Sequence, residues 1–364
     1  MGEVQTAAGA REPIRRPEAP AGVALAAVPA PLRATADAGS TDAVPAAAAP
    51  VGAAGPLLTD AAPAPAPVEN RFGKVSELRL AARARDGRTA LPGLFATMPF
   101  KVMHPLAVGA SPCPGLAAAT GLAAPAQVMV MSVSAGIMAG DAQRIDVRVG
   151  EGAALQVTTQ AFEKIHRMDG GGSASRVTRL AVAPGAYLDY KPLPQVPFAG
   201  SSFASDTVVE LADATSRLVY GEILSCGRAA RGERFGYRRY ANRVEVRVAG
   251  APVFIDNTLY EPVASGGDMD MEGIGFYEGF SHLANLVLVN LGIDVERFEA
   301  IRAYLLGETG AIGARAGART DAAADDALAG GITRLASGDC LVKLLGHRAQ
   351  RLQGALDGVR ALLA

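Results

Sequence analysis

The chain has 364 residues, with 35 basic and 36 acidic side chains and a formal net charge of −1. A nearly neutral balance without a Lys- or Arg-rich cluster argues against nucleic acid and anionic membranes as partners. Three cysteines without a CxxC pair favour a reducing compartment, and the N-terminal segment lacks the apolar core of a secretion signal, so we expect a cytoplasmic location.

The first 68 residues differ in composition from the rest of the chain. They are rich in Ala, Pro and Gly and have few bulky side chains to bury. Because such a segment cannot offset the entropy lost on ordering, residues 1–68 are predicted to be a disordered extension. The folded part is predicted to span 69–364 as one β-rich domain. Its first strand, 75–84, is expected to turn back at Arg85-Asp86-Gly87-Arg88.

A stretch without charged residues follows, from Leu106 to Gly140. Its most apolar part, 128–133, is far shorter than the roughly 20 residues that a membrane-spanning helix needs. We therefore predict a buried strand after a loop, and no contact with a membrane.

The centre of the chain repeats one unit, in which an alternating apolar and polar run, a short turn and a second alternating run follow each other. Four copies cover 145–158, 178–190, 208–220 and 244–255. Each unit is typical of a β-hairpin. Because a strand buries only one face, a single hairpin cannot cover its own Val and Leu residues. A period of about 30 residues indicates stacked copies, so we predict a mainly β, layered β-solenoid-like body. A sandwich or barrel is the alternative.

The last part of the chain, about 276–364, is expected to form strand-helix units. A buried strand is predicted at 282–291 and a helix at 294–306, with Asp294 as its cap. A hairpin at 331–345 should precede a final helix at 348–363. Its apolar face would consist of Leu352, Leu356, Val359 and Leu363.

Common catalytic motifs are absent from the sequence, including GxxxxGK[ST], GxSxG and HExxH. Four carboxylates inside the repeated body could instead line a polar passage for a divalent metal, since oxygen ligands hold such ions exchangeably. These candidates are Asp141, Glu163, Glu222 and Glu233. The simpler alternative is that Glu222 and Glu233 form ion pairs with Arg228, Arg231 or Arg234. His166 is the best-placed histidine, although a surface or packing role is the simpler interpretation.

Five stretches, in this order and spacing, resemble the family of the urease accessory protein UreD, called UreH in some organisms. They are PFKVM (99–103), AGIMAGD (135–141), TTQAFEKI (158–165), PLPQVPFAGSSF (192–203) and EILSCGRAARGERF (222–235). The resemblance covers roughly residues 72–305 and, more loosely, the C-terminal helix. His166 stands where many relatives carry an aromatic residue, so no family role is carried over to it.

The resemblance implies a non-enzymatic urease maturation factor with a β-solenoid-like body and two helices. Such a scaffold would bind the urease apoprotein and the accessory protein UreF, and through UreF the GTPase UreG, as a dimer within the complex. Nickel would be in transit through an interior tunnel, with no tightly bound cofactor. Asp141, Glu163, Glu222 and Glu233 are then the candidates for the nickel route.

Two other functions compete with this interpretation. One is a β-solenoid enzyme acting on an acidic polysaccharide, and the other is a metal-independent binding module. The missing secretion signal counts against the enzyme. So does an aromatic content of 5% without Trp, because sugar rings are commonly bound by stacking on aromatic side chains.

Overall fold

Parallel stacking of the sequence repeats builds the body of the protein. The computed structural model describes residues 75–107, 121–309 and 326–363. In the first three repeats, the first run lies in one sheet (sheet A) and the second run in another (sheet B). Each run pairs in parallel with the equivalent run of the next repeat, for example Ile145 with Thr178 and Leu155 with Leu188. The result is a mainly β fold, a β-solenoid of about four turns.

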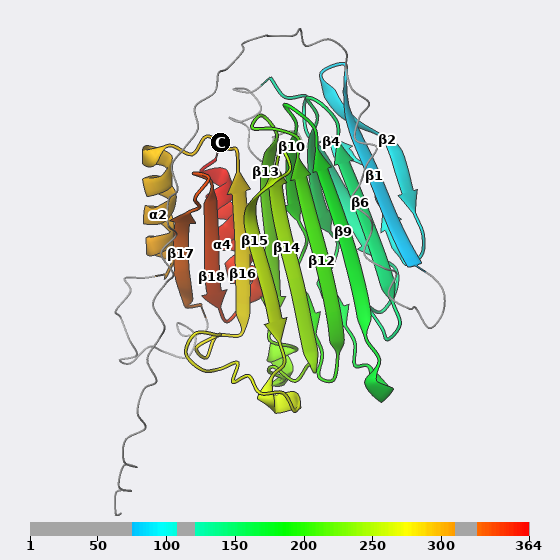
Figure 1. The fold of residues 1–364 in the computed structure, drawn as a ribbon, viewed down its shortest axis with the longest axis vertical. Helices are drawn as coiled ribbons and strands as arrows, with labels where there is room; N and C mark the ends of the chain where they lie inside the picture. Colours follow the sequence, from blue (N-terminus) through cyan, green and yellow to red (C-terminus); the bar gives the residue numbers. More distant parts are fainter. Residues whose placement is uncertain (1–74, 108–120, 310–325, 364) are drawn as a thin grey trace, which may run out of the picture. The chain divides into compact units, whose positions relative to one another are not determined.

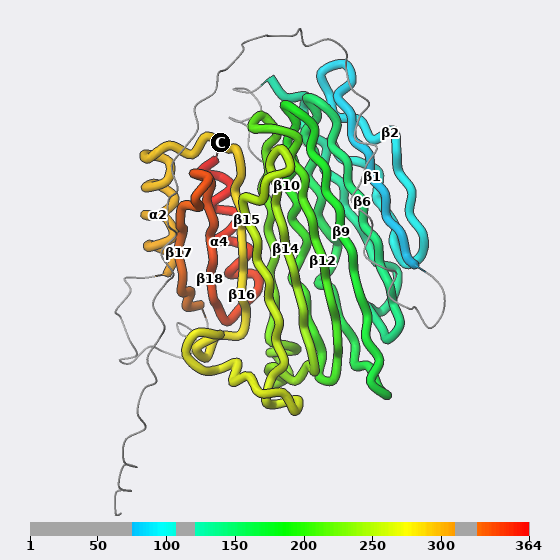
Figure 2. Tube along the Cα trace, viewed as in Figure 1, coloured from blue at the N-terminus to red at the C-terminus, as the bar shows by residue number. Residues whose placement is uncertain are grey.

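Sheet A has the strand order β15-β14-β12-β9-β6-β1-β2, and its central strands run side by side in Figures 1 and 2. Its strands are β1 (Val75–Arg85), β2 (Arg88–Ala96), β6 (Ala142–Val149), β9 (Ala174–Val182), β12 (Ser202–Leu211), β14 (Arg239–Val248) and β15 (Ala251–Tyr260).

Sheet B has the order β17-β18-β16-β13-β10-β7-β5-β3, with β4 paired to β5, β11 paired to β13, and β8 paired to β11. Its strands are β3 (Phe100–Val102), β4 (Leu106–Ala107), β5 (Ala126–Ser132), β7 (Ala154–Thr159), β8 (Glu163–Ile165), β10 (Tyr187–Lys191), β11 (Gln195–Pro197), β13 (Arg217–Ser225), β16 (His282–Val289), β17 (Leu328–Arg334) and β18 (Cys340–Gly346). Short 3-10 turns lie at Asp169–Gly171, Ala229–Arg231 and Val263–Ser265.

The prediction that every repeat is a β-hairpin is wrong for the first three copies. Their two runs lie in different sheets, because parallel pairing with the next copy lets each run bury its apolar face against the opposite sheet. The fourth copy is a true antiparallel hairpin, β14–β15. The predicted hairpins β1–β2 and β17–β18 are also antiparallel, as expected. The Ala/Pro-rich residues 1–68 lie outside the described residues.

The main apolar core fills the space between the two sheets. It is built from inward-facing side chains that recur at matching positions of successive strands, including Val147, Leu180 and Val209 of sheet A and Leu155 and Leu188 of sheet B. A second apolar layer lies between the other face of sheet B and two helices, α2 (Val295–Thr309) and α4 (Ala349–Ala361). The predicted apolar face of the last helix is confirmed, since Leu352, Leu356, Val359 and Leu363 are all buried.

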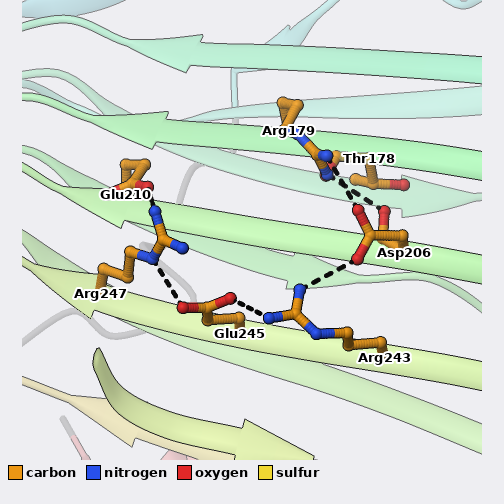
Figure 3. A network of polar contacts seen from close by, with 7 residues as sticks. All are labelled: Thr178, Arg179, Asp206, Glu210, Arg243, Glu245 and Arg247. Carbon is orange, nitrogen blue, oxygen red and sulfur yellow. Dashed lines mark hydrogen bonds and ion pairs between the residues drawn. The ribbon is translucent and has the colours of Figure 1, made fainter. Parts of the chain in front are cut away.

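The outer face of sheet A carries a ladder of ion pairs (Figure 3). Arg243 lies between Asp206 and Glu245, with Nη1 3.2 Å from Asp206 Oδ1. Arg247 continues the ladder from Glu245 to Glu210, at 2.7 and 3.1 Å. Asp206, Glu210 and the two arginines are partly exposed, and pairs between exposed groups contribute at most about 1 kcal/mol each. Glu245 is only 5% exposed, and both arginines neutralise it.

A buried ion pair attaches α4 to sheet B. Arg360 Nε of α4 lies 3.3 Å from Asp189 Oδ1 of β10, and the two side chains are only 5% and 0% exposed. Gln156 Nε2 donates to the second carboxylate oxygen, Asp189 Oδ2, at 2.7 Å. The C-terminal helix is thus held by a charge pair in addition to its apolar face.

Replacing Arg360 with Met should destabilise the protein by about 3–5 kcal/mol, because Asp189 would stay buried without its cation. Urea unfolding measures this loss. The double variant Asp189→Asn/Arg360→Met should recover most of it. The control Arg302→Met removes an exposed pair with Glu299 and should cost about 0.5 kcal/mol or less. Equal losses of stability in Arg360→Met and Arg302→Met would contradict a special role for the buried pair.

Candidate functional site

A row of polar side chains crosses the core between the sheets. In sheet A its members are partners across five neighbouring strands: Gln143, Arg176, Ser205, Asn242 and Thr258. They face inward because strand side chains alternate, and Gln143 and Asn242 lie two residues before the core residues Ile145 and Val244. In-register stacking therefore turns one polar position per repeat into a continuous row.

Sheet B supplies the opposite side of this row. Its members are Glu163, Gln195, Glu222, Asn285 and Lys343, of which Glu222, Asn285 and Lys343 are successive partners across β13, β16 and β18. The Lys343 side chain is 49% exposed, so it lies outside the buried part of the row. We call these ten residues the polar layer. A cavity of about 20 Å³ is lined by Gln195, Glu222 and Asn285 from sheet B and by Asn242 and Thr258 from sheet A, among others. A second cavity, of about 40 Å³, adjoins Glu163 and Arg176.

Glu163 is neutralised by Arg176. The guanidinium binds both carboxylate oxygens, with Arg176 Nη1 2.6 Å from Glu163 Oε2, and the arginine side chain is 9% exposed. Arg176 Nε also donates to Gln143 Oε1 at 3.0 Å. Burial lowers the pKa of Arg176, but the charge and hydrogen bonds of Glu163 outweigh this effect and raise it. The guanidinium thus stays charged, and both carboxylate oxygens of Glu163 are engaged by it.

Glu222, in contrast, is surrounded by neutral donors. Its Oε1 accepts from Asn285 Nδ2 at 3.0 Å, and its Oε2 accepts from Asn242 Nδ2 at 3.0 Å and from the Tyr220 hydroxyl at 3.2 Å. No Lys or Arg of the described ranges pairs with it. Desolvation raises the pKa of Glu222 despite these hydrogen bonds, and the charge of Asp256 adds to the rise.

Asn285 links Glu222 to a second carboxylate. Its Nδ2 also lies 3.3 Å from Asp256 Oδ2, and Lys343 Nζ lies 3.5 Å from the same oxygen. Asn285 is 5% exposed, and its Oδ1 is buried without a hydrogen-bond partner among the described residues. A buried acceptor without a partner is uncommon in folded proteins and calls for a physical explanation.

Tyrosines complete the walls around the two carboxylates. The rings of Tyr190 and Tyr220 stack with centroids 5.7 Å apart, and the Tyr240 hydroxyl donates to Gln195 Oε1 at 3.0 Å. Burial raises the pKa of Tyr190 to about 12. Burial also raises the pKa of Tyr220 and Tyr240, and these two phenols donate to Glu222 and Gln195.

The other two sequence candidates lie in loops. Glu233 pairs with Arg228, with Nε 2.7 Å from Oε2, while its Oε1 accepts from the Ala199 amide at 2.6 Å. The predicted alternative of an arginine partner thus holds for Glu233 and is wrong for Glu222. Asp141 Oδ2 accepts from the Met138 amide at 2.8 Å and so shapes its own loop. The structure brings Glu163 and Glu222 into the polar layer, but not Asp141 and Glu233.

His166 has the packing role that was the simpler interpretation. Its ring makes an edge contact with Phe198, with centroids 4.9 Å apart, and its Nε2 lies 3.0 Å from the Ala135 carbonyl oxygen. Within the described ranges, no three or more His, Cys, Asp or Glu side chains form a group suited to a metal ion. None of the described helices is both long and apolar enough to cross a membrane.

Sequence reasoning missed most of the polar layer. Arg176, Asn242 and Asn285 were not among the candidates, although each carries one of the interactions above. A signal for Asn242 exists in the sequence, because it is a polar residue in phase with the buried Val244 and Val246. A polar residue at an inward position of an alternating run therefore marks a member of such a layer.

The fold and the polar layer together define a class: a two-sheet β-solenoid with paired and unpaired carboxylates inside its core. The model of the UreD urease accessory protein family matches residues 74–364 of this chain. The chain therefore belongs to the UreD family of urease accessory proteins.

Three relatives illustrate the similarity. UreD of Acetivibrio thermocellus is 32% identical over 296 residues, which cover 81% of this chain and 100% of that protein. UreH of Helicobacter pylori strain P12 is 34% identical over 244 residues, 67% of this chain and 85% of that protein. UreD of Actinobacillus pleuropneumoniae serotype 5b is 30% identical over 278 residues, 76% and 93% of the two chains.

The raised pKa of Glu222 predicts how its replacement changes stability with pH. A carboxyl group whose pKa is higher in the folded than in the unfolded state favours folding when protonated, and this contribution is lost as the pH rises through the folded pKa. Because Gln carries no charge, Glu222→Gln should raise the melting temperature relative to the unmodified chain more at pH 8 than at pH 4.5. Glu210→Gln, on the outer face of sheet A, is the control. The same difference in melting temperature at both pH values would show that desolvation does not set the pKa of Glu222.

Proposed function

We propose that this chain is a urease maturation factor, a non-catalytic scaffold that binds the urease apoprotein and helps to deliver nickel to its active site. The observation that carries the proposal is the family match over residues 74–364, which includes all of the residues that the structure describes. The names of the relatives, urease accessory proteins UreD and UreH, point to the same role.

The proposed partners are the urease apoprotein, the accessory protein UreF and, through UreF, the GTPase UreG. In this proposal the chain acts in the cytoplasm, as part of a dimer within the complex, and the C-terminal strands and helices hold the partner accessory protein. The firm attachment of α4 to sheet B by the Asp189–Arg360 pair supports this part, because a partner would then meet a rigid surface.

Nickel is the cargo in this proposal, in transit and not tightly bound. The candidate route includes Glu163 and Glu222 in the polar layer. Asp141 and Glu233, which lie in loops, are the other two candidates. Glu163 and Glu222 are the stronger candidates, because they line the two interior cavities. Asp141 and Glu233 have structural hydrogen bonds of their own, so their replacement also perturbs loops.

The competing functions have less support. An enzyme for acidic polysaccharides needs cationic groups that are free to bind substrate carboxylates. On the outer face of sheet A, Arg179, Arg243 and Arg247 are instead paired with carboxylates of the same sheet (Figure 3). A metal-independent binding module differs from the proposed function in one result only, because it would leave the nickel content of urease unchanged when interior carboxylates are replaced.

Replacing Glu163 or Glu222 with Gln should lower the nickel content per urease molecule severalfold. The reason is that each change removes a negative charge from the interior but keeps the size of the side chain. Urease is purified from cells that express it with its accessory proteins and the variant chain, and its nickel is measured by mass spectrometry.

Two controls make this experiment specific. Glu210→Gln removes an outer-face carboxylate and should leave the nickel content unchanged. Co-purification of each variant with urease shows whether the complex still forms. Normal nickel loading by both interior variants would refute the proposed route and leave the scaffold role standing.

A further inference from the structure

The first turn of the solenoid leaves large apolar side chains in contact with solvent. Strand β2 is the last strand of sheet A, and among the described residues no further strand continues the sheet beyond it (Figure 1). Five apolar side chains near the link between β2 and β3 are between 39% and 73% exposed, and we call them the terminal patch. They are Val75, Leu94, Phe95, Met98 and Val133. Terminal units of repeat proteins usually present a polar outer face, so an apolar patch at this end calls for a cover.

Backbone hydrogen bonds bring the members of the terminal patch together at the link. The Thr97 amide donates to the Glu77 carbonyl oxygen at 2.8 Å, two residues after Val75 and one residue before Met98. The Val133 amide donates to the carbonyl oxygen of the residue after Met98, at 2.9 Å. The other two members lie near the end of β2, just before the link. The patch is therefore one surface, although its residues come from three separate segments.

The charged groups beside the terminal patch pair with one another. Arg79 binds the Glu77 carboxylate and also lies over the Phe95 ring, 5.3 Å from its centroid. Arg144 lies 3.9 Å from the same carboxylate. The patch thus offers apolar burial to an occupant and does not add an unpaired charge. An uncharged apolar segment suits such a surface better than a charged one, because a charge would lose its hydration there.

The chain contains such a segment upstream of the patch. Residues 1–74 lie outside the described residues and lead directly into Val75, a member of the patch. Within them, residues 19–32 carry no charge and contain the densest group of bulky apolar side chains. This group consists of Val23, Leu25, Val28 and Leu32. So few bulky side chains cannot form a core of their own, whereas a preformed apolar surface would supply the missing contacts.

We propose that residues 19–32 bind to the terminal patch of their own chain and cover the open end of the first solenoid turn. The connection is long enough, because residues 33–74 span about 140 Å when extended. Since the segment and the patch belong to one molecule, binding is intramolecular, and the effective concentration of the segment at the patch is high. The UreD family match begins at residue 74, so this contact adds to the fold that the family shares. It does not depend on the proposed function.

The test is photo-crosslinking of the purified full-length chain. A benzophenone amino acid in place of Met98 reacts on illumination with C–H groups that contact it, and mass spectrometry of the digested monomer identifies the attached peptide. Most of the crosslinked monomer should carry the link within residues 19–32. The same amino acid in place of Ile274 is the position control, because this exposed residue lies in the loop after β15, at the other end of sheet A. It should not give this product.

Two matched changes in the upstream residues make the result specific. Leu25→Asp/Val28→Asp should lower the yield of the crosslink about fivefold or more, because two charges would enter the apolar contact. Val44→Asp/Val51→Asp adds the same charges outside the segment and should change the yield by less than about twofold. Equal yields in these two variants would overturn the proposal. So would crosslinks from position 98 to a second copy, to another part of the chain, or to nothing.

Discussion

In-register parallel stacking is the constraint on which the rest of the structure depends. Since equivalent residues of successive repeats lie side by side, a single choice of side chain at one repeat position becomes a row across the whole body. Val147, Leu180, Val209 and Val246 form such a row and contribute to an apolar core. The position four residues earlier is occupied by Gln143, Arg176, Ser205 and Asn242, and the same rule turns it into the polar layer.

A polar row inside a core must satisfy its own hydrogen bonds, and the two ends of this layer do so differently. At one end, Arg176 forms an ion pair with Glu163, and Gln143 Oε1 accepts from Arg176 Nε and Nη2. At the other end, two amides and a phenol bind Glu222 without a cationic partner, and desolvation raises its pKa.

The sequence predicted the strands, the repeat and the helices because alternation and helical spacing are local properties. Alternation shows which face of a strand is buried but not which strand lies beside it, and so the first three repeats were wrongly interpreted as hairpins. For the same reason, the sequence does not show which polar residues meet in the candidate site. Glu222 meets Asn285 because β13 and β16 pair in antiparallel register, a contact between residues 63 positions apart that neither segment signals alone.

The family resemblance indicates the general role of the chain, whereas the folded structure shows which candidate residues lie in its interior. Their place inside the repeated body made Glu163 and Glu222 candidates, but the sequence does not distinguish these residues from Asp141 and Glu233, which lie in loops. Whether a polar residue lies inside the body depends on which side of its strand faces the opposite sheet. Arg176 lies in the polar layer because its side of β9 faces sheet B. Its inward position in β9 follows from the phase of Leu180 and Val182, whereas its pairing with Glu163 is a property of the folded chain.

The most direct test of the maturation role is the nickel content of urease purified from cells that carry the urease genes and the other accessory proteins, with and without this chain. The account predicts that urease accumulates without the chain but stays poor in nickel and inactive, and that restoring the chain restores both nickel and activity. Fully loaded, active urease in cells that lack the chain would contradict it.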